Sequence, residues 1–227
     1  MKEYLKKERD KISRIDGWSA KTEYIWQYYK LWIIGIAVLI FFSVFAIRQY
    51  FFQVNENWFY ITFTNTYAEV GDGSDLWKGY VEYTGYDLKE KNVVFNNSSY
   101  FDYKEGVTGN SYFQAFVAYT EGGTLDAITM ETDSLTALGE SGRLIDLNSE
   151  ECASIREKYG DRFLYCIPLD TEYSTEPVPV GIDISDSILM TRYHMYNNSC
   201  GLGIGAKSGD IDAVEAFLDY LYSEDAR

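Results

Sequence analysis

The ten residues from Gly201 to Asp210, GLGIGAKSGD, come close to a phosphate-binding loop. Such a loop reads G-x-x-x-x-G-K-[ST]: its backbone amides hold phosphates, its lysine reaches the outer phosphates and its hydroxyl binds magnesium. Lys207 and Ser208 stand at the required offsets, but Ala206 replaces the second glycine, and only one helix follows in which to find a magnesium-binding acid. We therefore interpret the segment as a short strand followed by a helix cap at Ser208 or Asp210.

Other combinations of catalytic or metal-binding residues are weak. No G-x-S-x-G nucleophile motif occurs, and carboxylates are numerous enough for a catalytic pair to arise by chance. His194 is the single histidine, and no C-x-x-C pair exists among Cys152, Cys166 and Cys200, so a metal site is not expected. We predict a protein that is not an enzyme and that has no catalytic residue, metal or cofactor.

The first element that the sequence predicts is an uncharged apolar segment, Leu31–Ile47. As a helix these residues would span about 25 Å, near the lower limit for crossing a bilayer. Aromatic residues flank both ends, and Lys30 and Arg48 can reach the two membrane surfaces. The segment has no polar face and no clear A-x-A cleavage site follows it. We therefore favour a retained single-pass anchor, residues 31–53, over a core helix or a cleaved signal peptide.

Charge predicts the orientation of this anchor. Residues 1–30 contain eight Lys or Arg and five Asp or Glu, whereas residues 48–227 contain twelve basic and thirty acidic residues. Basic residues beside a membrane span remain in the cytoplasm. We expect a cytoplasmic leader (1–30), the anchor in the cell membrane and an acidic extracellular domain (54–227) whose charge argues against nucleic acid as a partner. An oxidising exterior permits one disulfide among the three cysteines, and the sequence leaves its pairing open.

Strand-like and helix-like segments alternate through residues 54–227, which predicts an α/β domain built as a three-layer sandwich. Strands are expected within 55–67, 91–103, 125–130, 162–169, 177–185 and 202–206, and helices within 74–87, 110–123, 133–142, 149–160 and 211–227. The fourth and fifth strand segments contain Pro168, Pro177 and Pro179. Because proline cannot donate to a sheet ladder, we expect these two segments at sheet edges.

Three short patterns follow one another in this domain. A helix ends at Gly122-Gly123, a strand opens with Asp126-Ala127-Ile128, and a G-x-L-x-D-L segment runs from Gly142 to Leu147. In this order they resemble the first lobe of the extracellular solute-binding proteins of ABC importers, and residues 203–227 are similar to that family's closing strand and helix. The resemblance implies one lobe of a periplasmic-binding-protein-like fold.

The chain departs from that family in two ways. Roughly fifty residues separate Leu147 from Gly201, too few for a second α/β lobe. The lipoprotein cysteine that usually anchors such proteins is absent, and the apolar segment stands in its place. The sequence therefore resembles a one-lobed, membrane-anchored relative, and capture of a ligand by closure of two lobes is not expected.

Ligands of open α/β sheets bind beyond the carboxyl ends of the strands. The candidates that follow the first three strands are Thr64, Asn65, Tyr67, Tyr100, Tyr103, Glu131 and Thr132. Tyrosines can stack on sugar rings and donate a hydrogen bond. We therefore expect a module that binds a carbohydrate or another small solute. The alternative is a protein-interaction or scaffold subunit of a cell-surface complex, which has lost ligand capture and offers its open face to a surface protein.

Overall fold

The computed structural model describes residues 9–51, 54 and 56–224, and the chain divides into two compact units, Met1–Gln53 and Val54–Arg227. The first unit contains helix α2 (Trp18–Phe51). The part of it from Trp18 to Ile47 is long and apolar enough to cross a membrane, as an anchor or as a signal sequence. This helix includes the apolar segment Leu31–Ile47 of the expected anchor, and residues 52 and 53 of that anchor lie outside the described residues.

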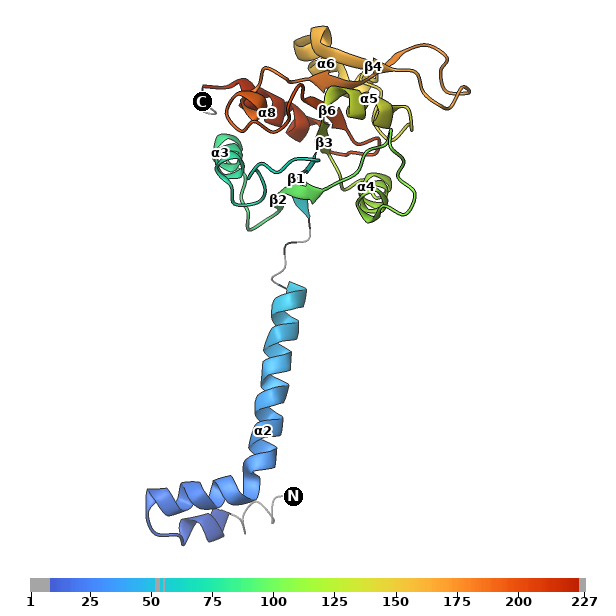
Figure 1. Ribbon diagram of the computed structural model, residues 1–227. Coiled ribbons are helices and arrows are strands. Elements are labelled where there is room, and N and C mark those ends of the chain that lie inside the picture. Colours follow the sequence, from blue (N-terminus) through green and yellow to red (C-terminus); the bar gives the residue numbers. More distant parts are fainter. Residues whose placement is uncertain (1–8, 52–53, 55, 225–227) are drawn as a thin grey trace. The chain divides into compact units, whose positions relative to one another are not determined.

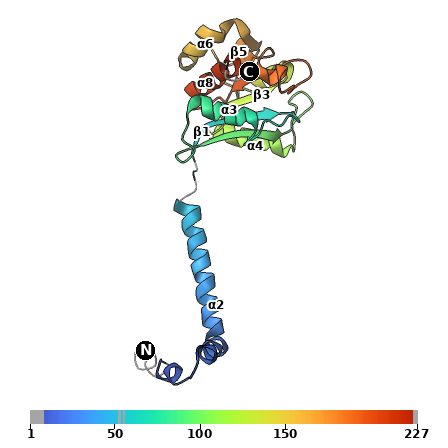
Figure 2. The same cartoon turned by 90° about the vertical axis from the view of Figure 1, so that its left-hand side faces the viewer.

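The second unit is an α/β domain with a six-stranded, mixed, open sheet that is flanked by helices (Figures 1 and 2). The strands are β1 (Asn57–Thr64), β2 (Asn92–Ser99), β3 (Ala127–Met130), β4 (Phe163–Cys166), β5 (Val178–Asp183) and β6 (Gly201–Ile204), in the order β2-β1-β3-β6-β5-β4. β1 pairs in parallel with β2 and β3. β6 runs antiparallel to both β3 and β5, and β4 runs antiparallel to β5. The predicted α/β class is confirmed.

The helices begin and end largely where the sequence signals them. They are α3 (Asp75–Thr84), α4 (Ser111–Glu121), α5 (Thr132–Gly139), α6 (Ala153–Tyr159), α7 (Ile188–Thr191) and α8 (Ile211–Tyr222), with 3-10 turns η1 (Glu150–Cys152) and η2 (Gly160–Arg162). Ser74 caps α3 by accepting a hydrogen bond from the Trp77 amide, and Gly85 ends that helix with a φ of 69°. Asp210 is the residue before α8, but its side chain makes no capping bond.

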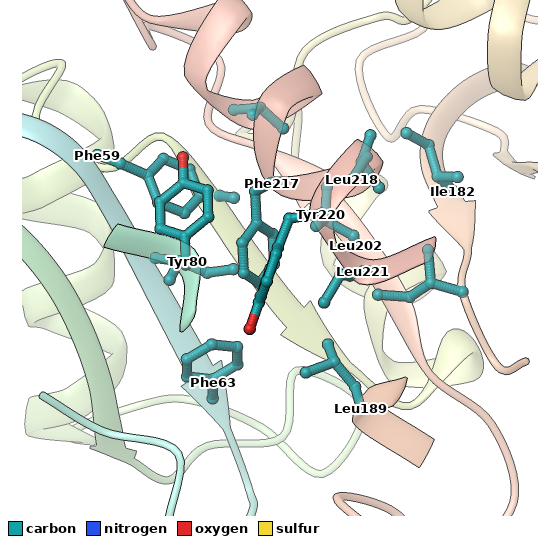
Figure 3. Close-up of a cluster of buried hydrophobic side chains, with 14 of the residues drawn as sticks. Phe59, Phe63, Tyr80, Ile182, Leu189, Leu202, Phe217, Leu218, Tyr220 and Leu221 are labelled. Carbon is teal, nitrogen blue, oxygen red and sulfur yellow. The ribbon is translucent and has the colours of Figure 1, made fainter. Parts of the chain in front are cut away.

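Two apolar clusters lie against opposite faces of the sheet, because successive residues of a strand point to opposite sides. Phe59, Ile61 and Phe63 of β1 join the larger cluster together with α3 and α8. Tyr60 belongs to the second cluster, together with α4 and α5. Figure 3 shows Phe217 of α8 beside Phe59, with ring centroids 5.3 Å apart, at the centre of the larger cluster.

The glycines of the phosphate-loop-like segment serve packing. A Cβ at Gly201 would lie 2.8 Å from Cδ2 of Leu135 on α5, and one at Gly203 would lie 2.9 Å from Leu144. These alternate residues of β6 therefore allow both leucines to approach the strand backbone. Lys207 bonds to Glu121 at 2.8 Å, and Ser208 donates to Asp126 at 2.8 Å. The interpretation of the segment as a strand is confirmed.

The expectation that the proline-containing strands both lie at sheet edges is wrong for β5. β4 is an edge strand, but β5 lies between β6 and β4, with Pro179 opposite Tyr165. The pairing of β4 with β5 shifts register between Leu164 and Tyr165, next to the position where Pro179 has no N–H to donate. The carbonyl of Pro179 accepts a hydrogen bond from the Leu147 amide at 2.9 Å.

The three cysteines are buried free thiols, so the structure contains none of the disulfides that the sequence permits. Cys152 and Cys200 belong to the larger cluster, and Cys166 belongs to the second. Burial raises the pKa of Cys166 to about 11 and also raises that of Cys200. The thiols therefore behave as small apolar side chains.

Candidate functional site

A cavity of about 530 Å³ lies beyond the carboxyl ends of β1 and β3. Four stretches of chain meet there: the turn after β1, the residues that follow β2, those that follow β3, and the segment between α7 and β6. The lining residues are Asn65, Tyr67, Ala68, Asp102, Glu131, Ser134, Tyr193, His194, Met195, Tyr196 and Asn197. This is the edge of the sheet at which the sequence predicts a ligand site.

Three of the seven predicted residues, Asn65, Tyr67 and Glu131, line this cavity. The other four do not. The hydroxyl of Thr64 is buried without a hydrogen-bond partner in the described structure, and Thr132 is hydrogen-bonded to Ser199 at 2.9 Å.

The remaining two predicted residues are tyrosines that stabilise loops. Tyr100 donates its hydroxyl to the Thr66 carbonyl at 3.0 Å. The ring of Tyr103 packs against Phe113, with centroids 5.9 Å apart. Tyr100 therefore supports the turn after β1 from behind, whereas Tyr103 belongs to the packing around α4.

Asn65 positions the wall of the cavity through its amide. The side-chain nitrogen donates to the Phe101 carbonyl at 2.7 Å, and the side-chain oxygen accepts from the Phe101 amide at 3.0 Å. This pair of bonds ties the end of β1 to the residues after β2 and brings Asp102 to the cavity. Because both polar groups of the amide are occupied, Asn65 acts as a positioning residue.

The segment from Tyr193 to Asn197 is fixed to the same edge by buried hydrogen bonds. The Thr66 hydroxyl donates to the Met195 carbonyl at 2.9 Å. The Tyr196 hydroxyl donates to the Thr129 carbonyl on β3, also at 2.9 Å. His194 is thereby placed at the cavity although it lies far from β1 and β3 in sequence.

Backbone strain is concentrated at this cavity. In the described part of the chain, the non-glycine residues with positive φ are Asn65, at 60°, and His194, at 48°. Such conformations cost of order 1 kcal/mol or more and persist where the surroundings enforce them, which is common at functional sites. Both residues line the cavity, so the strain and the site coincide.

An exposed tyrosine ring stands at the cavity. Tyr67 is 91% exposed, and its ring centroid lies 5.6 Å from that of Tyr100. Tyr100 in turn contacts Tyr112 edge to face at 5.9 Å. Tyr67 therefore presents an open aromatic face that the rings behind it support.

The cavity carries negative charge. Asp102 and Glu131 line it, and its lining includes no lysine or arginine. Within the described residues neither carboxylate has an ion-pair partner, whereas nearby Asp133 pairs with Lys104 at 3.7 Å. Carboxylates accept hydrogen bonds from hydroxyl and ammonium groups and repel anions. Among the described residues, no group of three or more His, Cys, Asp or Glu side chains can hold a metal ion.

Sequence reasoning missed side chains next to the positions chosen after the strands and side chains from a distant segment. Asp102 lies between the chosen Tyr100 and Tyr103, and Ser134 lies two residues after Thr132, whereas Tyr193 and Asn197 come from a segment without helical or strand periodicity. The signal available in that segment was its composition, TRYHMYNNS, which combines aromatic and polar residues around the one histidine.

The fold and this cavity define an α/β domain with a polar, tyrosine-bearing cavity at the carboxyl ends of its parallel strands. No protein-family model, no curated protein and no solved structure matches the chain. A fold of this class supports many functions, so the chemistry of the cavity carries the functional assignment.

Proposed function

We propose that this protein is a membrane-anchored, extracellular, non-enzymatic module that binds a neutral polyhydroxylated solute, a carbohydrate in the first place, in the cavity at β1 and β3. The observation that carries the proposal is the combination of the exposed Tyr67 ring with the unpaired Glu131 carboxylate in one cavity. A sugar ring would stack on the tyrosine while its hydroxyl groups donate to the carboxylate.

The charge of the cavity supports a neutral solute. Asp102 and Glu131 would repel phosphates and carboxylates, and the lining offers no guanidinium or ammonium group to bind them. Residues 48–227, with twelve basic and thirty acidic residues, extend the same repulsion over the whole domain.

The likeness to one lobe of a solute-binding protein, a three-layer sandwich, is supported by the positions of the strands and the helix that follow Leu147. After Leu147 the described chain adds β4, β5 and β6 to the same sheet. β6 pairs with β3, and α8 packs against the cluster that contains β1, as the resemblance implies for the closing strand and helix.

The membrane part of the proposal rests on α2 and on charge. The apolar segment of this helix would cross the cell membrane as a single span. The eight basic residues before position 31 would keep the amino terminus in the cytoplasm and leave residues 54–227 outside.

A thermal-shift screen of the full chain in detergent against monosaccharides, oligosaccharides, amino acids and short peptides tests the proposal. Ligand at a hundredfold excess over Kd stabilises the native state by about 2.7 kcal/mol. We expect stabilisation by one class of sugar, and we expect Tyr67→Ala and Glu131→Gln each to weaken its affinity about tenfold or more.

The control variant is Tyr165→Ala, which removes an exposed tyrosine of β4 far from the cavity in the sheet order and should leave the affinity unchanged. Unfolding temperatures of the free variants show whether they remain folded. The proposal is wrong if no sugar shifts the transition at saturating concentration, or if Tyr165→Ala weakens binding as much as Tyr67→Ala.

A further inference from the structure

A second cavity, of about 640 Å³, lies at the other end of the sheet order, near the edge strand β4. It is formed by the end of α5, the segment that follows this helix, and the loop between β4 and β5, which projects from the sheet (Figure 1). Apolar side chains contribute to its lining, among them Leu144, Val178 and Val180. Its volume is within the range of ligand-binding clefts. We refer to it as the acidic groove.

Five carboxylates line the acidic groove: Glu140, Asp146, Glu150, Glu151 and Asp170. No lysine, arginine or histidine is among the residues that line it. In the described structure none of the five carboxylates forms a salt bridge. The groove therefore concentrates negative charge, and no cationic side chain is among the residues that line it.

Arg156 of neighbouring α6 forms no salt bridge with these carboxylates in the described structure. Arg156 directs Nη1 to the carbonyl oxygens of Leu147, Asn148 and Ser149, at 2.8 to 3.3 Å. On the opposite wall, the Tyr173 hydroxyl donates to the Asp146 carboxylate at 3.1 Å. The Leu169 amide donates to the Glu140 carbonyl at 2.9 Å. These last two bonds hold the β4–β5 loop against the groove.

Exposed apolar side chains continue from the groove along the edge of the sheet. Tyr165, Ile167 and Leu169 are 54%, 57% and 64% exposed. Pro168, between the last two, lines the groove itself. β4 is paired on one side only, so an extended partner can contact its free edge. Apolar surface, free strand edge and uncompensated carboxylates therefore adjoin one another.

We propose that the acidic groove and the adjoining edge of β4 bind an extended cationic peptide segment of a partner protein, in which lysine or arginine alternates with apolar residues. Alternate side chains of an extended strand point to opposite sides, so its basic side chains would reach the carboxylates while its apolar ones cover Ile167 and Leu169. A second copy of this chain fits the surface poorly, because its acidic domain would repel five unpaired carboxylates.

Fluorescence anisotropy with a labelled peptide of sequence KLKLKL, titrated with the full chain in phosphatidylcholine nanodiscs, tests this proposal, with empty nanodiscs as the blank. We expect saturable binding that weakens about tenfold or more when the salt concentration rises from about 0.05 to 0.5 M. The peptides ELELEL, which reverses the charge, and KSKSKS, which removes the apolar side chains, should each bind at least about tenfold more weakly.

Two matched double variants separate the groove from the general acidity of the domain. Glu150→Gln with Glu151→Gln removes two groove carboxylates and should weaken KLKLKL about tenfold. Glu82→Gln with Glu90→Gln removes two exposed carboxylates outside the groove and should leave its affinity unchanged.

Equal weakening by both pairs would overturn the proposal, because it would show that the peptide senses only net charge. Absence of saturable KLKLKL binding would also overturn it. Tyr67→Ala and Glu131→Gln, the variants that test sugar binding, should not change peptide binding. The result of the peptide experiment is therefore independent of the function proposed above.

Discussion

The carboxylate of Asp126 is 6% exposed and lies between β1 and the loop that precedes α8. It accepts hydrogen bonds from the Tyr60 amide and the Ser208 hydroxyl, both at 2.8 Å. Burial raises its pKa to about 6, with a further contribution from Asp210, although the two hydrogen bonds act in the opposite direction. The folded protein therefore binds this proton more tightly than the unfolded chain does.

We predict that Asp126→Asn changes how stability depends on pH. The stabilising contribution of the native proton is complete below pH about 4 and is lost as the pH rises through about 6. The free energy of unfolding of the variant, relative to the wild type, should therefore rise between pH 4 and 7, by on the order of 1 to 3 kcal/mol. Urea unfolding at four pH values measures this difference, and a constant difference would contradict the prediction.

Individual site residues could be predicted from the sequence only where they follow the end of a predicted strand. Asn65, Tyr67 and Glu131 directly follow β1 and β3, so the rule that ligands bind beyond strand ends found them. His194 reaches the cavity through the bonds of Thr66 and Tyr196, which join segments about 130 and 67 residues apart. No local pattern encodes such bonds.

Among the elements, α3 and α8 pack closely at Gly79. A Cβ at this position would overlap the hydroxyl group of Tyr220, which is 2% exposed. Replacement of a helical glycine by alanine ordinarily stabilises by up to about 1 kcal/mol. Here the buried ring has little room to move, so the steric cost exceeds that gain.

We predict that Gly79→Ala destabilises the protein by about 1 to 3 kcal/mol in the wild-type background. In a Tyr220→Phe background, where the hydroxyl is absent, the same change should be neutral or stabilising, because the gain in helix propensity remains. Denaturant unfolding of the four proteins of this double-mutant cycle gives the coupling. Equal effects of Gly79→Ala in both backgrounds would show that the Tyr220 hydroxyl is not the cause.

Most elements could be predicted from sequence, but their arrangement could not. Each of the six expected strand segments overlaps a strand, since alternation and turn residues are local signals. The place of β5 inside the sheet was not predictable, because it depends on the register shift between β4 and β5 next to Pro179. α7, with four residues, is too short to show helical periodicity.

For the whole molecule, the orientation in the membrane is the property to test. Lys89 is exposed in the acidic domain, Lys6 is in the basic leader, and the three native cysteines are buried. A membrane-impermeant maleimide should therefore label Lys89→Cys on intact cells but label Lys6→Cys only after permeabilisation, because basic residues beside a span stay in the cytoplasm. The opposite pattern would reverse the proposed topology, and release of a shortened chain would identify a cleaved signal sequence.

The position of Phe217 at the centre of the larger cluster has a consequence for the timing of folding. Its ring lies 5.3 Å from Phe59 and Tyr80 and 5.6 Å from Phe95, yet the ribosome adds it more than 150 residues after Phe59. β3 likewise lacks its antiparallel partner β6 until residues 201–204 have been added. A nascent chain that lacks both cannot complete its core, so we expect it to remain unfolded during synthesis. A chain that folds late remains extended for longer. It can therefore pass through a secretion channel before it becomes compact.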